Sequence, residues 1–219
     1  VYRLDLCEGR FYAPLDTASP AINACGWSSA HGLFGCAGSG GLLECFDLRQ
    51  RKHVGQVDAA AVAGAPGAEL TSLCFDDMGL QVAAGTSTGC VALFDLRSPR
   101  PLQVKDHMYG SKILDIKFHS STGGIGGLGG SKRVISSDSH IIKAWEVDTG
   151  EMYASIEPEC GSINDVCVWK DSGLFMVGCD QPKIEVNGYQ INRSADFIRF
   201  GFFISRLWGI CGSELYEHK

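Results

Sequence analysis

One segment recurs along this chain, and the repetition limits the possible folds more than any other feature. The clearest copies are residues 30–49 and 77–97, and both end in Phe-Asp-Leu-Arg. Looser copies begin at Arg133 and Asp171. A further short apolar segment precedes each copy, at residues 22–27, 70–75, 113–118 and 163–169. Self-similarity of this kind is typical of folds in which each repeat buries its apolar faces only by stacking on its neighbours.

Within the repeats, apolar and polar residues alternate with a period of two, which predicts short β-strands. In residues 113–118, for example, Leu114, Ile116 and Phe118 share one face. Residues 148–150 (Asp-Thr-Gly) suit a hairpin turn, and no segment before residue 195 shows convincing helical spacing. Four short strands in a unit of about 45 residues describe a blade of a β-propeller, so the sequence predicts an all-β propeller.

The composition is that of an ordinary globular protein, and it narrows the classes of function. Gly accounts for 28 of 219 residues without a three-residue period, which excludes collagen and favours many tight turns. The net charge of −6 argues against a bulk electrostatic grip on nucleic acid, although a local basic patch is compatible with it. No run of 18 apolar residues occurs, so no transmembrane span is predicted. Because the chain starts at Val1 rather than Met, we interpret it as a fragment of something longer.

Residue types that often form sites are present, but their spacing does not suit one. None of the ten cysteines forms a Cys-x-x-Cys pair, and we interpret them as buried free thiols in a reducing compartment, with a zinc site or a disulfide framework as alternatives. His31, His119 and His140 lack metal-ligand spacing, so no metal site and no cofactor is predicted. Residues 124–129 match Gly-x-Gly-x-x-Gly, but a strand is predicted to follow, which favours a loop insertion over a dinucleotide site.

The repeats resemble the WD repeat, whose third strand usually ends in Trp-Asp. Here the dipeptide is Phe-Asp at 46–47 and 94–95 and Trp-Glu at 145–146. The resemblance implies a structural hydrogen-bond network in the third unit among His107, Ser136, Asp138 and Trp145. A half-buried Asp needs donors, which a His ring and an indole N–H supply. No catalytic residue is predicted, because Ser136 lies within a strand and lacks the sharp turn that exposes a nucleophilic Ser.

A more specific resemblance extends over about residues 1–184. It rests on segments that match in order, residues 1–11, 102–110, 155–159 and 163–167. They resemble a nucleolar WD-repeat family, called nucleolar protein ten in animals and essential nuclear protein two in yeast, whose members are assembly factors of the small-subunit processome. The resemblance implies a nucleolar, non-enzymatic scaffold in small-subunit ribosome biogenesis. The implied partners are other pre-ribosomal assembly factors, with pre-ribosomal RNA or a small nucleolar ribonucleoprotein as further candidates, and neither a membrane nor a small-molecule substrate is expected.

The same resemblance implies a division into a partial propeller, residues 1–190, and a tail, residues 191–219. We expect half a blade at residues 1–15 and four blades at about 20–58, 68–105, 111–157 and 161–190. Family members have more propeller sequence before the position of Val1. Because a blade cannot cover its own faces, we expect this chain alone to be unstable or to aggregate.

The C-terminal tail shows no match to the family from about Glu185 onward. A divergent ending and intron read-through in the gene model both explain this, and a spliced message that lacks the tail would support the second. Apolar residues at helical spacing in 196–211 indicate a helix packed on the propeller, or disorder outside the native context. Arg199 and Arg206 interrupt the stretch, which argues against membrane insertion.

Basic residues gather at the predicted turns, where propellers make contacts. The candidates for partner contact are Arg49, Arg51, Lys52, Arg97, Arg100, Lys132 and Arg133. The words at 46–49 and 94–97 resemble the Trp-Asp-x-Arg box of WD-repeat substrate receptors for cullin ubiquitin ligases, so such a receptor is the alternative function. The simpler interpretation is a turn in which Asp caps backbone N–H groups and Arg is solvated. Contact with RNA phosphate or an acidic partner is the remaining use of these side chains.

Overall fold

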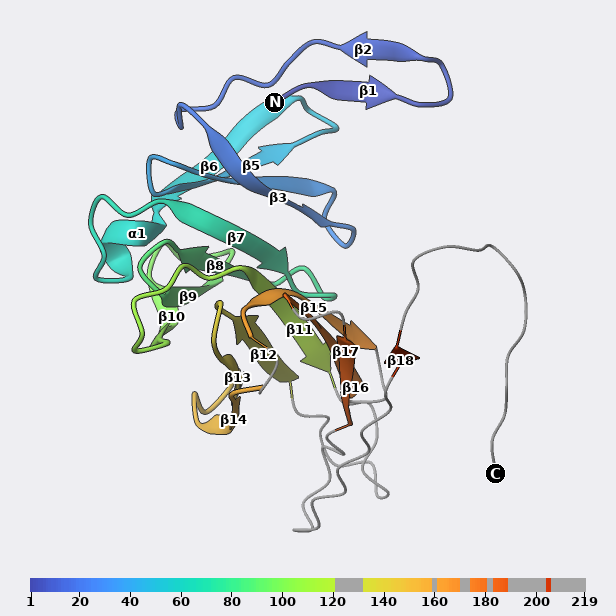
Figure 1. Ribbon diagram of the computed structural model, residues 1–219. Helices are drawn as coiled ribbons and strands as arrows, with labels where there is room; N and C mark the ends of the chain where they lie inside the picture. Colours follow the sequence, from blue (N-terminus) through green and yellow to red (C-terminus); the bar gives the residue numbers. More distant parts are fainter. Residues whose placement is uncertain (121–131, 159–160, 170–173, 181–182, 189–203, 206–219) are drawn as a thin grey trace, which may run out of the picture.

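Five antiparallel sheets follow one another along the chain and stack in succession (Figure 1). The computed structural model describes residues 1–120, 132–158, 161–169, 174–180, 183–188 and 204–205. In every sheet, strands that are consecutive in sequence are hydrogen-bonded neighbours. Stacked four-stranded meanders are the blades of a β-propeller, so the predicted all-β fold is confirmed.

The strands are short, and four sheets contain four strands each. The N-terminal hairpin pairs β1 (Arg3–Asp5) with β2 (Arg10–Tyr12). Blade 1 contains β3 (Ile22–Ser28), β4 (Leu33–Gly38), β5 (Leu42–Asp47) and β6 (Lys52–Asp58), and blade 2 contains β7 (Leu70–Phe75), β8 (Gln81–Thr86), β9 (Cys90–Asp95) and β10 (Pro101–Asp106). Blade 3 contains β11 (Asp115–Ser120), β12 (Lys132–Ser137), β13 (Ile142–Glu146) and β14 (Met152–Ile156), and blade 4 contains β15 (Ile163–Trp169), β16 (Leu174–Cys179), β17 (Lys183–Gly188) and β18 (Ile204–Ser205).

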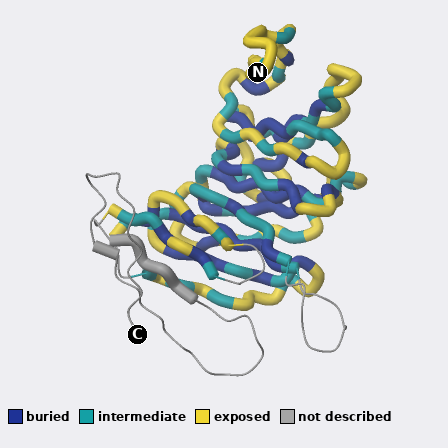
Figure 2. Tube along the Cα trace, turned by 90° about the vertical axis from the view of Figure 1, so that its right-hand side faces the viewer, coloured by how far each residue is buried: buried dark blue, intermediate teal, exposed yellow. Residues whose placement is uncertain are grey.

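The hydrophobic core lies between successive sheets. Figure 2 shows buried residues between the sheets and exposed residues mainly at the turns. A blade inside the stack is covered on both faces, so apolar side chains that point either way along one strand are buried. The interfaces from blade 1 to blade 4 are built from Leu43, Leu70, Phe75 and Phe94, then Leu93, Ile113 and Trp145, then Ile135, Ile163 and Phe175.

Glycines allow neighbouring blades to approach closely. A Cβ atom at Gly35 in blade 1 would lie 2.7 Å from the ring of Phe75 in blade 2. A Cβ atom at Gly85 in blade 2 would lie 2.6 Å from Cβ of Ile113, which enters blade 3. Each blade thus presents bare backbone where a bulky side chain of the next blade packs, and this explains part of the high glycine content.

The two ends of the stack differ in their connections. Because each blade is an antiparallel meander, the turns between its first and second strands and between its third and fourth strands lie at one end, which we call the turn end. The turn between the second and third strands and the linker to the next blade lie at the other, which we call the linker end. This division places the basic residues of the turns at one end and His107 and Asp138 at the other.

Two expectations about helices are corrected. A single helical turn, α1 (Ala59–Val62), follows β6, where no helix was predicted. Asp58 Oδ1 caps it by accepting from Ala61 N at 2.9 Å, and one turn is too short to show a period in the sequence. In the tail, Ile204 and Ser205 form β18 on β17, so they are not helical. The rest of residues 196–211 lies outside the described residues.

The remaining sequence expectations concern the Gly-rich segment, the membrane and the cysteines. Residues 124–129 lie outside the described residues, and the strand β12 follows them as predicted. No described helix has the length and apolar character needed to cross a bilayer. Seven described cysteines are free, but Cys7, Cys25 and Cys167 are exposed rather than buried. Cys179 is disulfide-bonded, so the interpretation of the cysteines as free thiols is wrong at this position.

Candidate functional site

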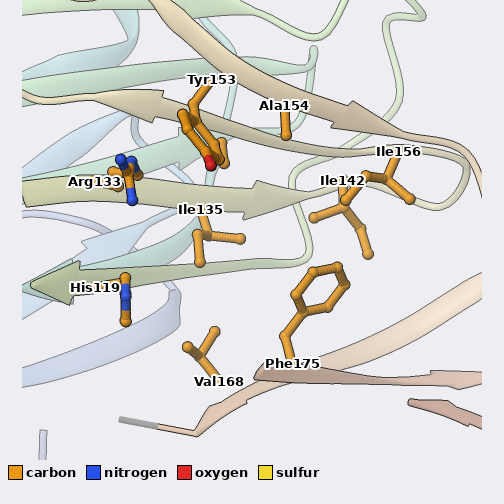
Figure 3. Close-up of a pocket in the computed structure, with 10 residues that line it drawn as sticks. His119, Arg133, Ile135, Ile142, Tyr153, Ala154, Ile156, Val168 and Phe175 are labelled. Carbon is orange, nitrogen blue, oxygen red and sulfur yellow. The ribbon is translucent and has the colours of Figure 1, made fainter. Parts of the chain in front are cut away.

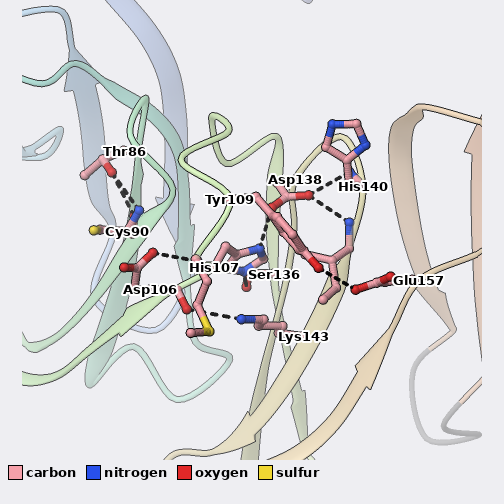
Figure 4. Close-up of polar contacts among 12 residues, drawn as sticks. Thr86, Cys90, Asp106, His107, Tyr109, Ser136, Asp138, His140, Lys143 and Glu157 are labelled. Carbon is pink, nitrogen blue, oxygen red and sulfur yellow. Dashed lines mark hydrogen bonds and ion pairs between the residues drawn. The ribbon is translucent and has the colours of Figure 1, made fainter.

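A buried polar network joins blades 2 and 3 at the linker end (Figure 4). His107, which directly follows β10, is fully buried. Its Nδ1 lies 3.1 Å from Asp138 Oδ2, and its Nε2 lies 2.5 Å from Ser136 Oγ. Since a carboxylate only accepts, Nδ1–H donates to Asp138, and Nε2 accepts from the Ser136 hydroxyl. The structure therefore brings together three of the four residues that the WD resemblance implied.

The second carboxylate oxygen of Asp138 accepts hydrogen bonds within its own turn. Its Oδ1 accepts from the backbone N–H of His140 at 2.7 Å and of Ile141 at 2.8 Å. The carboxylate is thus held by two amides and one imidazole while fully buried. This set of partners fixes the turn between β12 and β13 against the linker from blade 2.

Trp145 does not join this network, which corrects the fourth member of the predicted set. Its indole Nε1 is buried and has no hydrogen-bond partner among the described residues. In the ladder Ser136 pairs with Lys143, whereas Trp145 pairs with Val134, two positions further along. The ring packs instead among Leu93, Ile113 and its neighbours in the interface with blade 2.

Two buried charged residues also tie a blade to the segment before it, which is the linker at Ala18–Ser19 for blade 1 and the end of β10 for blade 3, and sequence reasoning missed both. Lys143 Nζ donates to Asp106 O at 3.2 Å, and Glu44 accepts from Ala18 N at 2.8 Å and Ser19 N at 3.0 Å. Each residue lies two positions before the aromatic residue of the Trp-Asp-like dipeptide. The signal available in the sequence was a charge inside an otherwise apolar strand, which is rare unless the charge is paired.

Stability of the chain should fall on acidification, because of His107. Burial, together with the nearby Lys143 ammonium, lowers the pKa of His107 below its ordinary value of 6.5, and Asp138 only partly opposes this. His107 of the unfolded chain therefore takes up a proton at a higher pH than His107 of the folded chain. The contribution of the neutral ring to the free energy of unfolding is fully present above pH 6.5 and decreases as the pH falls below that value. We expect the urea midpoint to drop between about pH 7.5 and pH 5.5, and to drop less in His107→Gln, which cannot titrate. An equal drop in both proteins would contradict this assignment.

A small apolar cavity lies between blades 3 and 4 (Figure 3). Ile135, Ile142 and Phe175 line it, together with the edges of His119 and Arg133. Its volume of about 30 Å³ is that of one water molecule, far below the volume of a cofactor. This cavity is therefore a packing gap rather than a ligand site.

A larger groove opens between β6 and the β9–β10 turn. It has a volume of about 410 Å³, and its wall is largely apolar, with Leu43, Val57 and Phe94 among its lining residues. Hydrogen bonds from Arg97 lower the pKa of Asp95 at its edge to about 2, and burial raises the pKa of Cys45 to about 11. A permanently charged pair and a neutral thiol suit binding better than proton transfer near neutral pH.

All seven predicted contact residues lie at the turn end, but the structure separates them into two groups. Arg49 and Arg51 occupy the β5–β6 turn, Lys52 begins β6, and Arg97 and Arg100 occupy the β9–β10 turn; all five are exposed. Arg97 donates to both carboxylate oxygens of Asp95, at 2.9 Å and 2.6 Å, and Arg49 donates to His31 O at 2.5 Å. That these five contact a partner stays a prediction.

The other two residues, at the start of β12, serve packing between strands. Arg133 is only 6% exposed, and its guanidinium lies 4.0 Å from the ring centroid of Tyr153. The expectation that Arg133 contacts a partner is therefore wrong, because stacking on Tyr153 and pairing with Glu146 at 3.6 Å bury it. Lys132 is partly buried and forms an ion pair with Asp76 of blade 2. Among the described residues, no group of three or more His, Cys, Asp or Glu side chains could hold a metal ion.

Comparison with known families identifies the propeller. A β-propeller family model described as the nucleolar protein 10-like, N-terminal domain matches residues 1–190. Nucleolar protein 10 of Xenopus tropicalis is 42% identical over an alignment of 194 residues that covers 85% of this chain and 26% of that protein. Human nucleolar protein 10 is 38% identical over 191 residues, with the same coverage of 85% and 26%. The ribosome biogenesis protein enp2 homolog of Schizosaccharomyces pombe is 36% identical over an alignment of 188 residues that covers 80% of this chain and 29% of that protein.

Solved structures agree on the fold. A chain of the mitotic checkpoint complex superposes with a TM-score of 0.70 at 14% identity, over 86% of this chain and 54% of that one. Raptor of Chaetomium thermophilum superposes with a TM-score of 0.65 at 17% identity, over 77% of this chain and 15% of that one. At such identities the likeness shows the propeller architecture and nothing about function.

The sequence relatives carry the functional information. Their names refer to the nucleolus and to ribosome biogenesis, and this confirms the nucleolar assignment that the resemblance predicted. The chain spans about a quarter of the length of these relatives. Since the family model covers residues 1–190, this chain belongs to the nucleolar protein 10-like family of β-propellers.

Proposed function

We propose that this chain is a non-enzymatic protein-interaction scaffold that acts in the nucleolus during assembly of the small ribosomal subunit, within the small-subunit processome. Its partners would be other pre-ribosomal assembly factors, with pre-ribosomal RNA or a small nucleolar ribonucleoprotein as further candidates. Support comes from the relatives named as ribosome biogenesis proteins, one of them 36% identical over 188 residues. A scaffold also suits a fold whose exposed turns are all carried on a packed stack.

The observation that carries a binding role is the preorganisation of the turns at the turn end. Asp5, Asp47 and Asp95 each accept the backbone N–H of the residue two positions on, at 2.9 Å, 2.8 Å and 2.9 Å. Each of these turns therefore has its backbone fixed by its first residue. A partner that docks on turns already held in place loses less conformational entropy than one that must order them.

The burial of Ser136, His107 and Asp138, which together have the composition of a catalytic triad, supports the non-enzymatic part of the proposal. Ser136, His107 and Asp138 do form a Ser–His–Asp chain of hydrogen bonds. All three are at most 1% exposed, however, so the Ser136 hydroxyl has no path to a substrate. Catalysis by such a set also needs donors placed around a reacting atom, which a buried interface leaves no room for. The same residues explain how blade 3 is held on blade 2.

Affinity purification tests this proposal against the alternative of a cullin-ligase substrate receptor. We expect the tagged full chain to recover pre-ribosomal proteins and precursor ribosomal RNA from nucleolar extract. Charge reversal at both Arg49 and Arg97 should leave the recovery of pre-ribosomal proteins intact, because these side chains are held within their own blades, by His31 O and by Asp95. Recovery of a cullin adaptor that is lost in the double variant would instead establish the receptor function.

A further inference from the structure

Three arginines converge on one tyrosine ring between the N-terminal hairpin and blade 1. The guanidinium carbons of Arg3, Arg10 and Arg51 lie 5.6 Å, 5.2 Å and 5.6 Å from the centroid of Tyr12. Arg3 and Tyr12 are direct cross-strand partners in the β1–β2 ladder, and Arg10 lies on the same face. Arg51 comes from the β5–β6 turn of blade 1, which lies beside the hairpin (Figure 1). We call these four residues the arginine cluster.

The arginine cluster holds more positive charge than its immediate contacts neutralise. Two carboxylates face the three guanidinium groups: Glu8 pairs with Arg10 at 2.6 Å, and Asp5 accepts from the Tyr12 hydroxyl at 2.9 Å. Arg3 donates to the carbonyl of Ala13 at 2.9 Å. The Nε of Arg3 is buried and has no hydrogen-bond partner among the described residues. Among the described residues, the guanidinium of Arg51 contacts the Tyr12 ring and forms no hydrogen bond or ion pair. The donors of the exposed Arg51 guanidinium are thus left available for an anion.

The backbone of Arg51 marks the cluster as a special position. Three turns between third and fourth strands align residue by residue: 5–10 (Asp-Leu-Cys-Glu-Gly-Arg), 47–52 (Asp-Leu-Arg-Gln-Arg-Lys) and 146–151 (Glu-Val-Asp-Thr-Gly-Glu). The fifth residue of each has a positive φ, +65° at Gly9, +55° at Arg51 and +72° at Gly150. Glycine takes this conformation freely, whereas an arginine there is strained. The corresponding turn of blade 2, residues 95–100 (Asp-Leu-Arg-Ser-Pro-Arg), has Pro99 at the fifth position. Strain at an exposed arginine, where two of the other three turns have glycine, is a sign that the side chain has a use.

We propose that the arginine cluster is a binding site for the phosphodiester backbone of RNA. Guanidinium groups present parallel N–H donors that match two oxygens of a phosphate, and their planar form also stacks on aromatic rings. Tyr12 gathers the three guanidinium groups by cation–π contacts, so that they stay close to one ring instead of dispersing into solvent. This inference rests on the proposed function and adds to it a ligand class and the residues that bind it.

The distribution of charge along the turn end favours RNA over a phosphorylated peptide. Arg49 lies in the same turn as Arg51, Lys52 follows at the start of β6, and Arg97 and Arg100 lie in the corresponding turn of blade 2. All four are exposed. Positive groups that recur from one blade to the next suit a ligand with one negative charge per repeat unit, whereas a phosphopeptide offers one phosphate.

The matched variant is Arg51→Gly, because it introduces the residue that two of the other three turns use. We expect the full chain to bind a fluorescently labelled single-stranded RNA of about 20 nucleotides, measured by anisotropy across a salt series. Arg51→Gly should weaken binding about five- to tenfold and reduce the slope of log K against log salt by about 0.7, the value for one lost phosphate contact. Its melting temperature should be unchanged or higher, so unfolding cannot explain the loss. Lys112→Gln, which removes one exposed charge at the linker end, is the control and should change neither quantity.

Several outcomes would overturn the RNA site. They are no binding by the unchanged chain, equal affinity and salt slope for the unchanged chain and Arg51→Gly, and equal losses in Arg51→Gly and Lys112→Gln. Displacement of the RNA by a singly phosphorylated peptide at the same phosphate concentration would assign the cluster to phosphopeptides instead. None of these outcomes bears on whether the chain is recovered with pre-ribosomal proteins, so a failure here is distinguishable from a failure of the scaffold proposal.

Discussion

Replacement of Gly85 by alanine is expected to lower the free energy of unfolding by about 3 kcal/mol, the upper end of the usual cost of overpacking. The added Cβ atom would lie 2.6 Å from both Cβ and Cγ2 of Ile113 and would also collide with the Ser72 hydroxyl. Ile113 cannot retreat easily, since its own amide donates to Thr86 O at 3.0 Å and its carbonyl accepts from Thr71 Oγ1 at 2.6 Å. Urea denaturation followed by circular dichroism would measure the loss.

A second glycine provides the control for this substitution. Gly55 lies in the exposed strand β6, and a Cβ atom there would meet nothing within 4 Å. Gly55→Ala should change stability by no more than about 0.5 kcal/mol, because only the entropy of the unfolded chain changes. If Gly85→Ala were as mild as Gly55→Ala, the close approach between blades 2 and 3 would not be a determinant of stability.

Removal of the Asp138 carboxylate should be still more damaging, at about 3–5 kcal/mol, the cost of breaking a buried polar network on one side. Asp138→Ala leaves three donors without partners: the His107 Nδ1–H and the backbone amides of His140 and Ile141. These groups are shielded from water in the folded chain, so each loses a hydrogen bond that it regains on unfolding. The measurement is the shift of the urea midpoint, with Asp148→Ala at an exposed turn as the control.

Asp138→Asn separates hydrogen bonding from charge at the same site. The Asn oxygen can still accept from the two amides, and its NH₂ group can donate to His107 if the ring changes tautomer and donates from Nε2 to Ser136. We therefore expect Asp138→Asn to cost about 1 kcal/mol, near the value of one ordinary hydrogen bond. An effect of Asp138→Asn as large as that of Asp138→Ala would mean that the charge, and not the set of acceptors, stabilises the interface.

Much of the fold followed from periodicity, because strands buried on both faces leave a strong pattern. The apolar segment 163–169 is β15 residue for residue, and the turn at 148–150 separates β13 from β14 as predicted. The helical turn α1 escaped prediction because its four residues, Ala59–Val62, cannot establish a period. Ile204 and Ser205 joined a sheet although their surroundings had helical spacing, since pairing with β17 outweighs a weak local preference.

Side-chain roles were harder to predict than strands, because they depend on register. The resemblance located His107, Ser136 and Asp138 correctly in one network, but it could not show that Trp145 lies two ladder positions away from Ser136. Arg133 was predicted to be a surface charge because it adjoins a turn. Its position in the strand instead places its guanidinium over the ring of Tyr153. The arginine cluster was missed because Arg51 reaches Tyr12 from a turn 39 residues further along the chain.

The buried charges on the third strands bear on how the repeats could be rearranged. Glu44 accepts hydrogen bonds from backbone amides of the linker that precedes blade 1. Lys143, at the corresponding position of blade 3, donates to the backbone carbonyl of Asp106. The segment that precedes each blade therefore meets a buried hydrogen-bond acceptor in blade 1 and a buried donor in blade 3. If these two blades were exchanged, donor would face donor and acceptor would face acceptor in a buried interface. The buried charges therefore favour one order of the repeats.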